Sequence, residues 1–379
     1  RRAGTGGSVD DRVDMLVDAA RTADMRDDAI PYATTFLTVA VALLAIGYAV
    51  RARLPAFVNR LLPTLAIAVL ALVPATFISA LLGVRTPVGL GLGVLVPAIV
   101  LTAALEALRR RRPFFAVAIA LAAIVGLLAV DLVLGAPLQL NTLFGYSTAV
   151  AGRFAGLGNL AFGFFAAATL LLAISVYEGL PRRWSLPVAC GVLVLGVLVD
   201  GLPMLGGDVG GVLAMVPAFG ITAMVLAGRT LRVRHVVAWF AIGAATVLAF
   251  GLIDLARPRA DRTHLARFLE RVRDGGFDAV SQLLERRWEA SFAGAGLLLF
   301  LLLGVALGLV VEYTFLRMEA GRRRVRLTLA GRAAAIGMAI LALVGLVAND
   351  SGAAVPAVML AVAVPVFLLR ADSWLGGRT

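Results

Sequence analysis

The chain contains no lysine, one cysteine and only two histidines among its 379 residues. The single cysteine, Cys190, excludes a disulfide within the chain, and the scarcity of cysteine and histidine argues against a zinc site. A divalent cation held by carboxylates stays open, so the sequence leaves the metal content unknown. The chain also lacks the glycine-rich fingerprints of nucleotide-binding loops, so no organic cofactor is expected.

The sequence consists largely of long apolar runs. Hydrophobic residues make up 61% of the chain and the mean hydropathy is +0.95, whereas soluble domains contain roughly 45–50% apolar residues. About 20 apolar residues are needed to cross a bilayer as a helix. The sequence therefore predicts an all-α polytopic membrane protein with about 11 transmembrane helices, near 31–50, 61–82, 87–108, 114–135, 157–177, 185–200, 209–227, 235–254, 293–316, 331–348 and 353–370.

The net charge of +12 would suggest a nucleic-acid partner in a soluble protein. Here the arginines gather in alternate short loops between apolar runs, as the positive-inside rule describes. The bilayer, not nucleic acid, is therefore the expected partner, and a bacterial plasma membrane is the expected location. The rule places the N-terminus outside, the C-terminus in the cytoplasm, and these loops on the cytoplasmic side: 51–60, 109–112, 182–183, 229–234 and 317–326.

The beginning of the chain is polar and carries four aspartates before residue 20. It has neither an initiator methionine nor a signal-peptide pattern, although the orientation places it outside. We expect residues 1–30 to be an extracytoplasmic segment that ends a missing ectodomain; processing of the start of the chain is the alternative. The transmembrane domain is expected over 31–370 and a cytoplasmic tail over 371–379.

Four polar, glycine-rich clusters interrupt the apolar sequence. With the spans drawn as above, all four lie at the outer face, opposite the arginine-rich loops. Polar clusters with unrelated roles would be expected at both faces of the membrane. Because all four fall at one face, we predict that they form one shared site. The clusters are 152–159 (GRFAGLGN), 200–211 (DGLPMLGGDVGG), 261–264 (DRTH) and 349–352 (NDSG).

These clusters carry the candidate site residues. Arginine offers a fixed pair of donors for phosphate, and glycines allow the backbone to approach a ligand closely. The predicted substrate-binding residues are Arg153, Asn159, Arg262, Asp200 and Ser351. An ionisable residue at a membrane boundary is a candidate acid or base, and the predicted catalytic residues are Asp208, His264 and Asp350.

Each cluster also has a structural interpretation that the sequence leaves open. Asp208 could cap its helix, the glycines could serve close helix packing, and 349–352 could be a simple hairpin turn. Residues 255–292 differ in composition and alternate charged with apolar positions at helical spacing. We expect two amphipathic helices on the outer interface there, with most arginines solvated and His264 as the exception.

Taken in order, GRFAGLGN, DGLPMLGGDVGG, RPRADRTHLARF and NDSGAAVPA resemble a family of uncharacterised actinobacterial membrane proteins. The resemblance covers about residues 140–370. Members often carry an N-terminal alkaline-phosphatase-like ectodomain, which implies a fused or separate extracytoplasmic partner domain. The family implies an architecture more than an activity.

A second similarity is to O-antigen ligases and polymerases of cell-envelope glycans. Residues 153–159 resemble the arginine-to-asparagine sequence that enters a middle helix in those proteins, and 255–292 with His264 resembles their large outer loop. The chain departs from them by lacking a proline beside Asn159 and by carrying acidic outer turns at Asp208 and Asp350. The similarity therefore serves as an analogy for the site.

These observations lead to the expected function of the chain. We expect it to bind an anionic precursor linked to a lipid of the polyprenyl-phosphate type at the outer face, and to transfer a glycan or phospho-group from it. A transporter or flippase of such a substrate is one alternative, and a non-catalytic scaffold is another. A polar pocket closed toward the membrane favours transfer, whereas a cavity open to both faces favours transport.

Overall fold

The computed structural model describes residues 8–84, 86–140, 142–146, 156–259, 262–263, 266, 270, 326–349 and 351–376. Within these residues, ten helices are long and apolar enough to cross a membrane. This confirms an all-α polytopic membrane protein. The predicted span 293–316 and most of the predicted amphipathic region 255–292 lie outside the described residues.

Apart from the first, the helices agree with the predicted spans to within a few residues. Two 3-10 turns follow the first two helices, η1 (Arg51–Arg53) and η2 (Ser79–Leu82). The helices are α1 (Val9–Ala49), α2 (Ala56–Ile78), α3 (Pro87–Arg111), α4 (Pro113–Val133), α6 (Asn159–Gly179), α7 (Arg182–Gly201), α8 (Val209–Leu226), α9 (Val233–Leu255), α12 (Leu329–Ala348) and α13 (Ala354–Trp374).

Helix α1 begins 22 residues before the predicted span and is continuous over 41 residues. Its start is fixed by a capping box in which Ser8 Oγ accepts from the backbone N–H of Asp11, while an Asp11 carboxylate oxygen accepts from that of Ser8. This reciprocal pair satisfies two donors that a helix start leaves open. The polar segment before residue 31 is therefore helical from Val9 onward.

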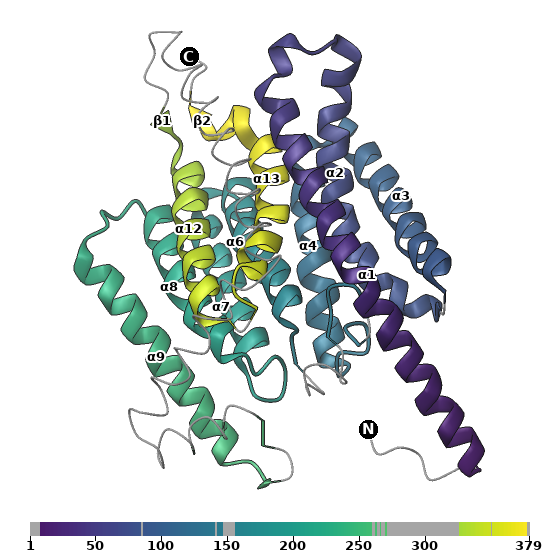
Figure 1. Ribbon diagram of the computed structural model, residues 1–379. Helices are drawn as coiled ribbons and strands as arrows, with labels where there is room; N and C mark the ends of the chain where they lie inside the picture. The colour runs from purple at the N-terminus through teal and green to yellow at the C-terminus, as the bar shows by residue number, and fades with distance from the viewer. Residues whose placement is uncertain are drawn as a thin grey trace.

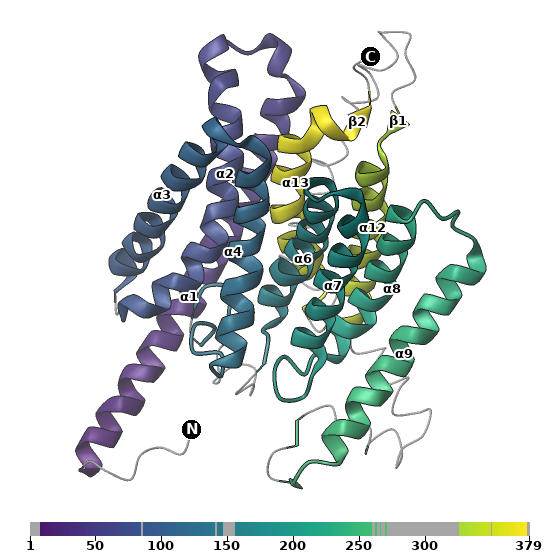
Figure 2. The same ribbon diagram turned by 180° about the vertical axis from the view of Figure 1, so that it is seen from behind.

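The helices form one bundle with two different ends (Figures 1 and 2). The connections from α1 to α2, α3 to α4, α6 to α7 and α8 to α9 lie at one end, here called the arginine-rich end. The segments 134–140, 142–146, 156–158, 202–208, 349 and 351–353 lie at the other, here called the polar end. The predicted sorting of polar clusters away from arginine-rich connections thus holds for the described segments.

The middle of the bundle is built from α6, α8 and α13, whose residues are mostly buried, whereas α3 and α9 at its two sides are mostly exposed (Figure 1). Two short strands, β1 (Arg326–Leu327) and β2 (Leu375–Gly376), pair antiparallel at the arginine-rich end. They hold the start of α12 beside the end of α13. The polar end therefore lies against the buried ends of these central helices.

Candidate functional site

The polar end brings segments from different motifs into backbone contact. Gly156 has a positive φ of 91°, and a Cβ on it would overlap the carbonyl oxygen of Gly206. A Cβ on Gly210 would likewise overlap the carbonyl oxygen of Ala348. Glycine is therefore required at both positions for close approach. Through these contacts, the segment 200–211 touches both the segment before α6 and the end of α12.

A side-chain hydrogen bond joins two of the predicted substrate-binding residues. Asn159, the first residue of α6, donates from Nδ2 to Ser351 Oγ at 2.8 Å. The backbone N–H of Ser351 in turn donates to Asn349 Oδ1 at 3.2 Å. The turn before α13 is thereby tied to the start of α6 by a partly buried hydrogen bond at the polar end.

The two predicted carboxylates of the second motif lie on either side of the turn between α7 and α8, Asp200 in the last turn of α7 and Asp208 directly before α8. Asp208 is the N-cap residue, and its Oδ1 accepts from the backbone N–H of Gly210 at 3.0 Å. The N–H of Asp208 donates to the carbonyl oxygen of Asp200, also at 3.0 Å. The carboxylate of Asp200 is fully buried beside Gly211 in the first turn of α8. Asp208, as the N-cap, lies where the partial positive charge of a helix start favours an anion.

Asp208 has a carboxylate oxygen that accepts no hydrogen bond from the described part of the protein. The residue is only 5% exposed, and its Oδ2 has no hydrogen-bond partner among the described residues. Leaving a buried carboxylate oxygen without a partner costs free energy. Such an oxygen is a candidate acceptor for a hydrogen bond or proton from a ligand.

In Asp254, at the end of α9, both carboxylate oxygens accept hydrogen bonds from the protein. Its Oδ2 accepts from Thr263 Oγ1 at 2.7 Å and from the backbone of Thr263 and Ala266 at 3.0 and 2.9 Å. Its Oδ1 accepts from Arg257 Nη1 at 3.1 Å, and the same nitrogen donates to the carbonyl oxygen of Pro203 at 3.2 Å. Asp254 thus binds Thr263 and Ala266 after α9, and its partner Arg257 connects it to the turn 202–208.

Arg262 is also occupied by the protein. It donates to the carbonyl oxygens of Leu255 and Arg257 at 2.8 and 3.1 Å, and its Nη1 pairs with Glu270 at 3.2 Å. All three guanidinium nitrogens therefore have protein acceptors. This favours a structural role for Arg262 over the predicted contact with phosphate.

Sequence reasoning missed a second buried network at this end. Asp131, near the end of α4, accepts from the backbone N–H of Leu138 and from Gln139 Nε2 at 2.7 and 3.1 Å. Gln139 Oε1 then accepts from the N–H of Gly158 at 2.8 Å. A lone carboxylate within the predicted span 114–135 was the available signal.

Arg26 of α1 also binds this region. It donates from Nε and Nη2 to the carbonyl oxygens of Thr142 and Gly145 at 2.8 and 2.9 Å. Together with Asp131 and Gln139, it binds the described residues 138–145 between α4 and α6. These three residues position the cluster rather than supply free chemical groups.

Below the cluster the described core is apolar. Phe162, Phe165 and Leu170 of α6 are fully buried. The buried hydroxyls of Thr169 and Thr222 donate to carbonyl oxygens of their own helices, at 2.7 Å each. No chain of carboxylates crosses the bundle within the described residues, where the core next to the polar end consists of apolar side chains and of hydroxyls bonded within their own helices.

Three predicted site residues, Arg153, His264 and Asp350, lie outside the described residues. Their assignment as site residues stays a prediction, as does that of the five others. Within the described part of the chain, no three histidine, cysteine, aspartate or glutamate side chains gather closely enough to hold a metal ion.

Comparison of the chain with models of protein families, with curated proteins and with solved structures gives no match. The comparisons therefore identify no family, and the resemblances drawn from the motifs stay predictions. What is established is a polytopic helical membrane protein whose predicted motifs meet, so far as they are described, at one end of its bundle.

Proposed function

We propose that the polar end binds an anionic precursor linked to a lipid of the polyprenyl-phosphate type and transfers a glycan or phospho-group from it. The observation that carries the proposal is the buried Oδ2 of Asp208, which has no hydrogen-bond partner among the described residues. A base needs an oxygen that can accept a proton, and Asp208 has one while Asp254 does not.

In a glycan transfer, the acceptor hydroxyl would form the new bond to the anomeric carbon of the glycan. The bond from that carbon to the lipid pyrophosphate would break, the pyrophosphate would leave with the bonding electrons, and the proton of the hydroxyl would pass to Asp208. Asn159 and Ser351 would orient the substrate. Arg153 is the remaining arginine candidate for the phosphate because Arg262 is engaged by the protein; His264 and Asp350 are further candidates for the base.

The scaffold alternative also has support. Asp208 Oδ1 caps α8, Asp254 binds the segment after α9, and Arg262 binds carbonyl oxygens, so much of the polarity serves the fold. The transporter alternative has less support, because the described core below Asp208 is apolar and its hydroxyls bond within their own helices. Substitution of Asp208 separates these three functions.

The test replaces Asp208 by asparagine in cells whose only copy of the protein is the variant. Lipid-linked precursors are then extracted and quantified, and the membrane leaflet in which they accumulate is determined. Transfer predicts accumulation in the leaflet that faces the polar end, whereas transport predicts accumulation in the opposite leaflet. Unchanged precursor levels at normal protein abundance would overturn the proposal and favour the scaffold.

The matched control is Asp28→Asn. Asp28 is exposed on α1, two residues from Arg26, which bonds to the polar end. The exchange removes the same charge at the same end of the bundle without touching the cluster. It should leave precursor levels unchanged.

A further inference from the structure

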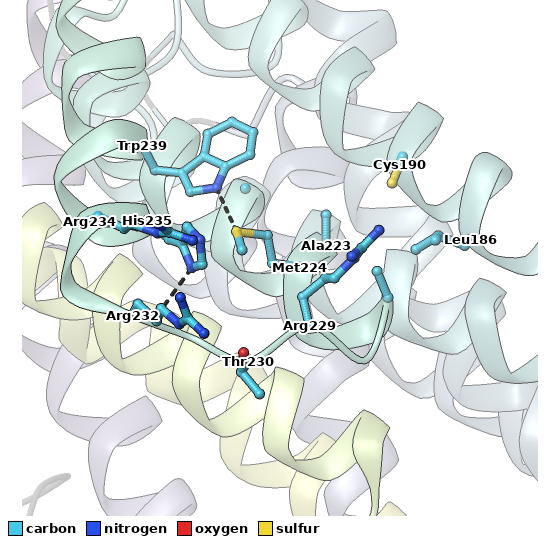
Figure 3. Close-up of a pocket in the computed structure, with 12 residues that line it drawn as sticks. Leu186, Cys190, Ala223, Met224, Arg229, Thr230, Arg232, Arg234, His235 and Trp239 are labelled. Atoms are coloured by element: carbon cyan, nitrogen blue, oxygen red, sulfur yellow. Dashed lines mark hydrogen bonds between the residues drawn. The ribbon is translucent and has the colours of Figure 1, made fainter.

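A cavity of about 580 Å³ lies between α7, α8 and α9 at the arginine-rich end (Figure 3). Asp208 caps the opposite end of α8. Its inner wall is apolar and comes from all three helices. Its rim comes from the connection between α8 and α9 and carries arginines. Figure 3 shows Arg229 extending toward Leu186 and Cys190 of α7, while Arg232 and His235 lie on the side of Trp239.

Helical spacing explains why one wall forms from three helices. Leu186 and Cys190 are four residues apart on α7, and His235 and Trp239 are four apart on α9. Side chains at this spacing share a face of a helix. On α8, a Cβ at Gly220 would overlap the ring of Trp239, so glycine lets the indole lie against the helix. The indole N–H donates to Met224 Sδ at 3.2 Å.

The rim is positively charged, and the described residues around it do not neutralise its charge. Arg229, Arg232 and Arg234 are exposed and line the cavity, whose lining contains neither aspartate nor glutamate. None of the three forms an ion pair with a residue in the described part of the chain. His235 Nδ1 accepts from the backbone N–H of Arg232 at 3.2 Å, which fixes the connection at the start of α9.

We propose that this cavity binds an anionic phospholipid, with its phosphate at Arg229, Arg232 and Arg234 and an acyl chain along the apolar wall. Arginine pairs bidentately with phosphate oxygens, and basic pockets between spanning helices suit anionic headgroups. The wall belongs to helices long and apolar enough to cross a membrane, so a chain lying on it stays among apolar groups. A soluble anion would gain nothing from that wall. Arginines that only set the orientation of the protein in the membrane need not line a cavity. The positive-inside rule therefore does not account for the cavity beside them.

Cys190 provides the reporter, because it is the only cysteine in the sequence and lines the cavity. The purified protein in detergent is alkylated with a maleimide in the presence of phosphatidylglycerol, phosphatidylcholine or inorganic phosphate alone. The proposal predicts that phosphatidylglycerol slows alkylation while the other two leave its rate unchanged. Equal protection by phosphatidylcholine, protection by inorganic phosphate alone, or no protection by any of them would overturn it.

Variants assign the effect to the rim. Replacing Arg229, Arg232 and Arg234 by glutamine should weaken protection by phosphatidylglycerol on the order of 100-fold in concentration. The control triple variant replaces Arg53, Arg111 and Arg112, which are exposed at the same end but do not line the cavity. It should retain full protection, and equal loss in both triple variants would contradict the proposal. Since the lipid comparison needs no substitution, the proposal stays testable if the rim variant does not fold.

Discussion

Asn159 donates a hydrogen bond to Ser351 across 192 residues of sequence, joining the first residue of α6 to the turn before α13 at 2.8 Å. The two residues come from different polar motifs, and one bond places both in the same cluster. Around them, Gly156 meets Gly206 and Gly210 meets Ala348 through backbone contacts that a side chain would block. The cluster is therefore held by direct contacts between motifs and not only by their location at one end of the bundle.

The Asn159–Ser351 bond should be measurable as a coupling energy. We expect Asn159→Ala and Ser351→Ala each to lower the free energy of unfolding, and the double variant to lower it by less than the two effects together. Hydrogen bonds between membrane helices average about 0.6 kcal/mol, so the coupling should be of that size. Denaturant unfolding in mixed micelles measures it, and strictly additive effects would show that the bond contributes nothing.

Gly210→Ala should destabilise the protein by about 1–3 kcal/mol, the usual cost of overpacking. The added methyl group would overlap the backbone of Ala348, which cannot rotate away as a side chain can, so α8 and α12 must move apart. Gly126→Ala is the control, because Gly126 lies in α4 with open space around it. It should raise stability by up to about 1 kcal/mol through helix propensity. Thermal unfolding followed by tryptophan fluorescence would compare the two, and equal shifts would contradict the packing argument.

The arginine-rich end is held by an ion pair between α6 and α13. Arg370 Nη2 donates to Glu178 Oε2 at 2.6 Å, Trp374 Nε1 donates to the same oxygen at 3.1 Å, and the Arg370 guanidinium lies 4.5 Å from the ring centre of Phe114. Arg370→Met should cost about 3 kcal/mol, because it leaves a largely buried carboxylate without its charged partner. Adding Glu178→Gln should recover part of that loss. A double variant less stable than Arg370→Met alone would show that the carboxylate is not the source of the cost.

Hydropathy predicted most of the helices of the bundle, because a helix that crosses lipid needs a long apolar run whatever it packs against. The predicted span 157–177, for example, agrees with the observed helix Asn159–Gly179 to within two residues. The same measure missed the first part of α1, which is polar; the local signal was Ser8 followed three residues later by Asp11, the spacing of a capping box.

The sequence predicted the contacts of the candidate site only in part. Glycine and polar residues marked 200–211 as unusual, but nothing in the sequence paired Gly156 with Gly206 or Asp131 with Gln139. Such pairs depend on how helices and connections pack in three dimensions. Composition likewise made Arg262 a candidate for phosphate, whereas its protein acceptors are visible only in the structure.

Two substitutions of Asp208 separate its role as a helix cap from its proposed role as a base. Asparagine can still accept the hydrogen bond from Gly210, so Asp208→Asn should keep stability within about 0.5 kcal/mol, whereas Asp208→Ala should lose about 1 kcal/mol. The amide cannot take up a proton as the carboxylate does, so both variants should accumulate lipid-linked precursor to the same extent. Unfolding measurements and precursor extraction on the same two variants provide the comparison. If only Asp208→Ala accumulates precursor, the loss of the helix cap accounts for the accumulation and Asp208 is not the base.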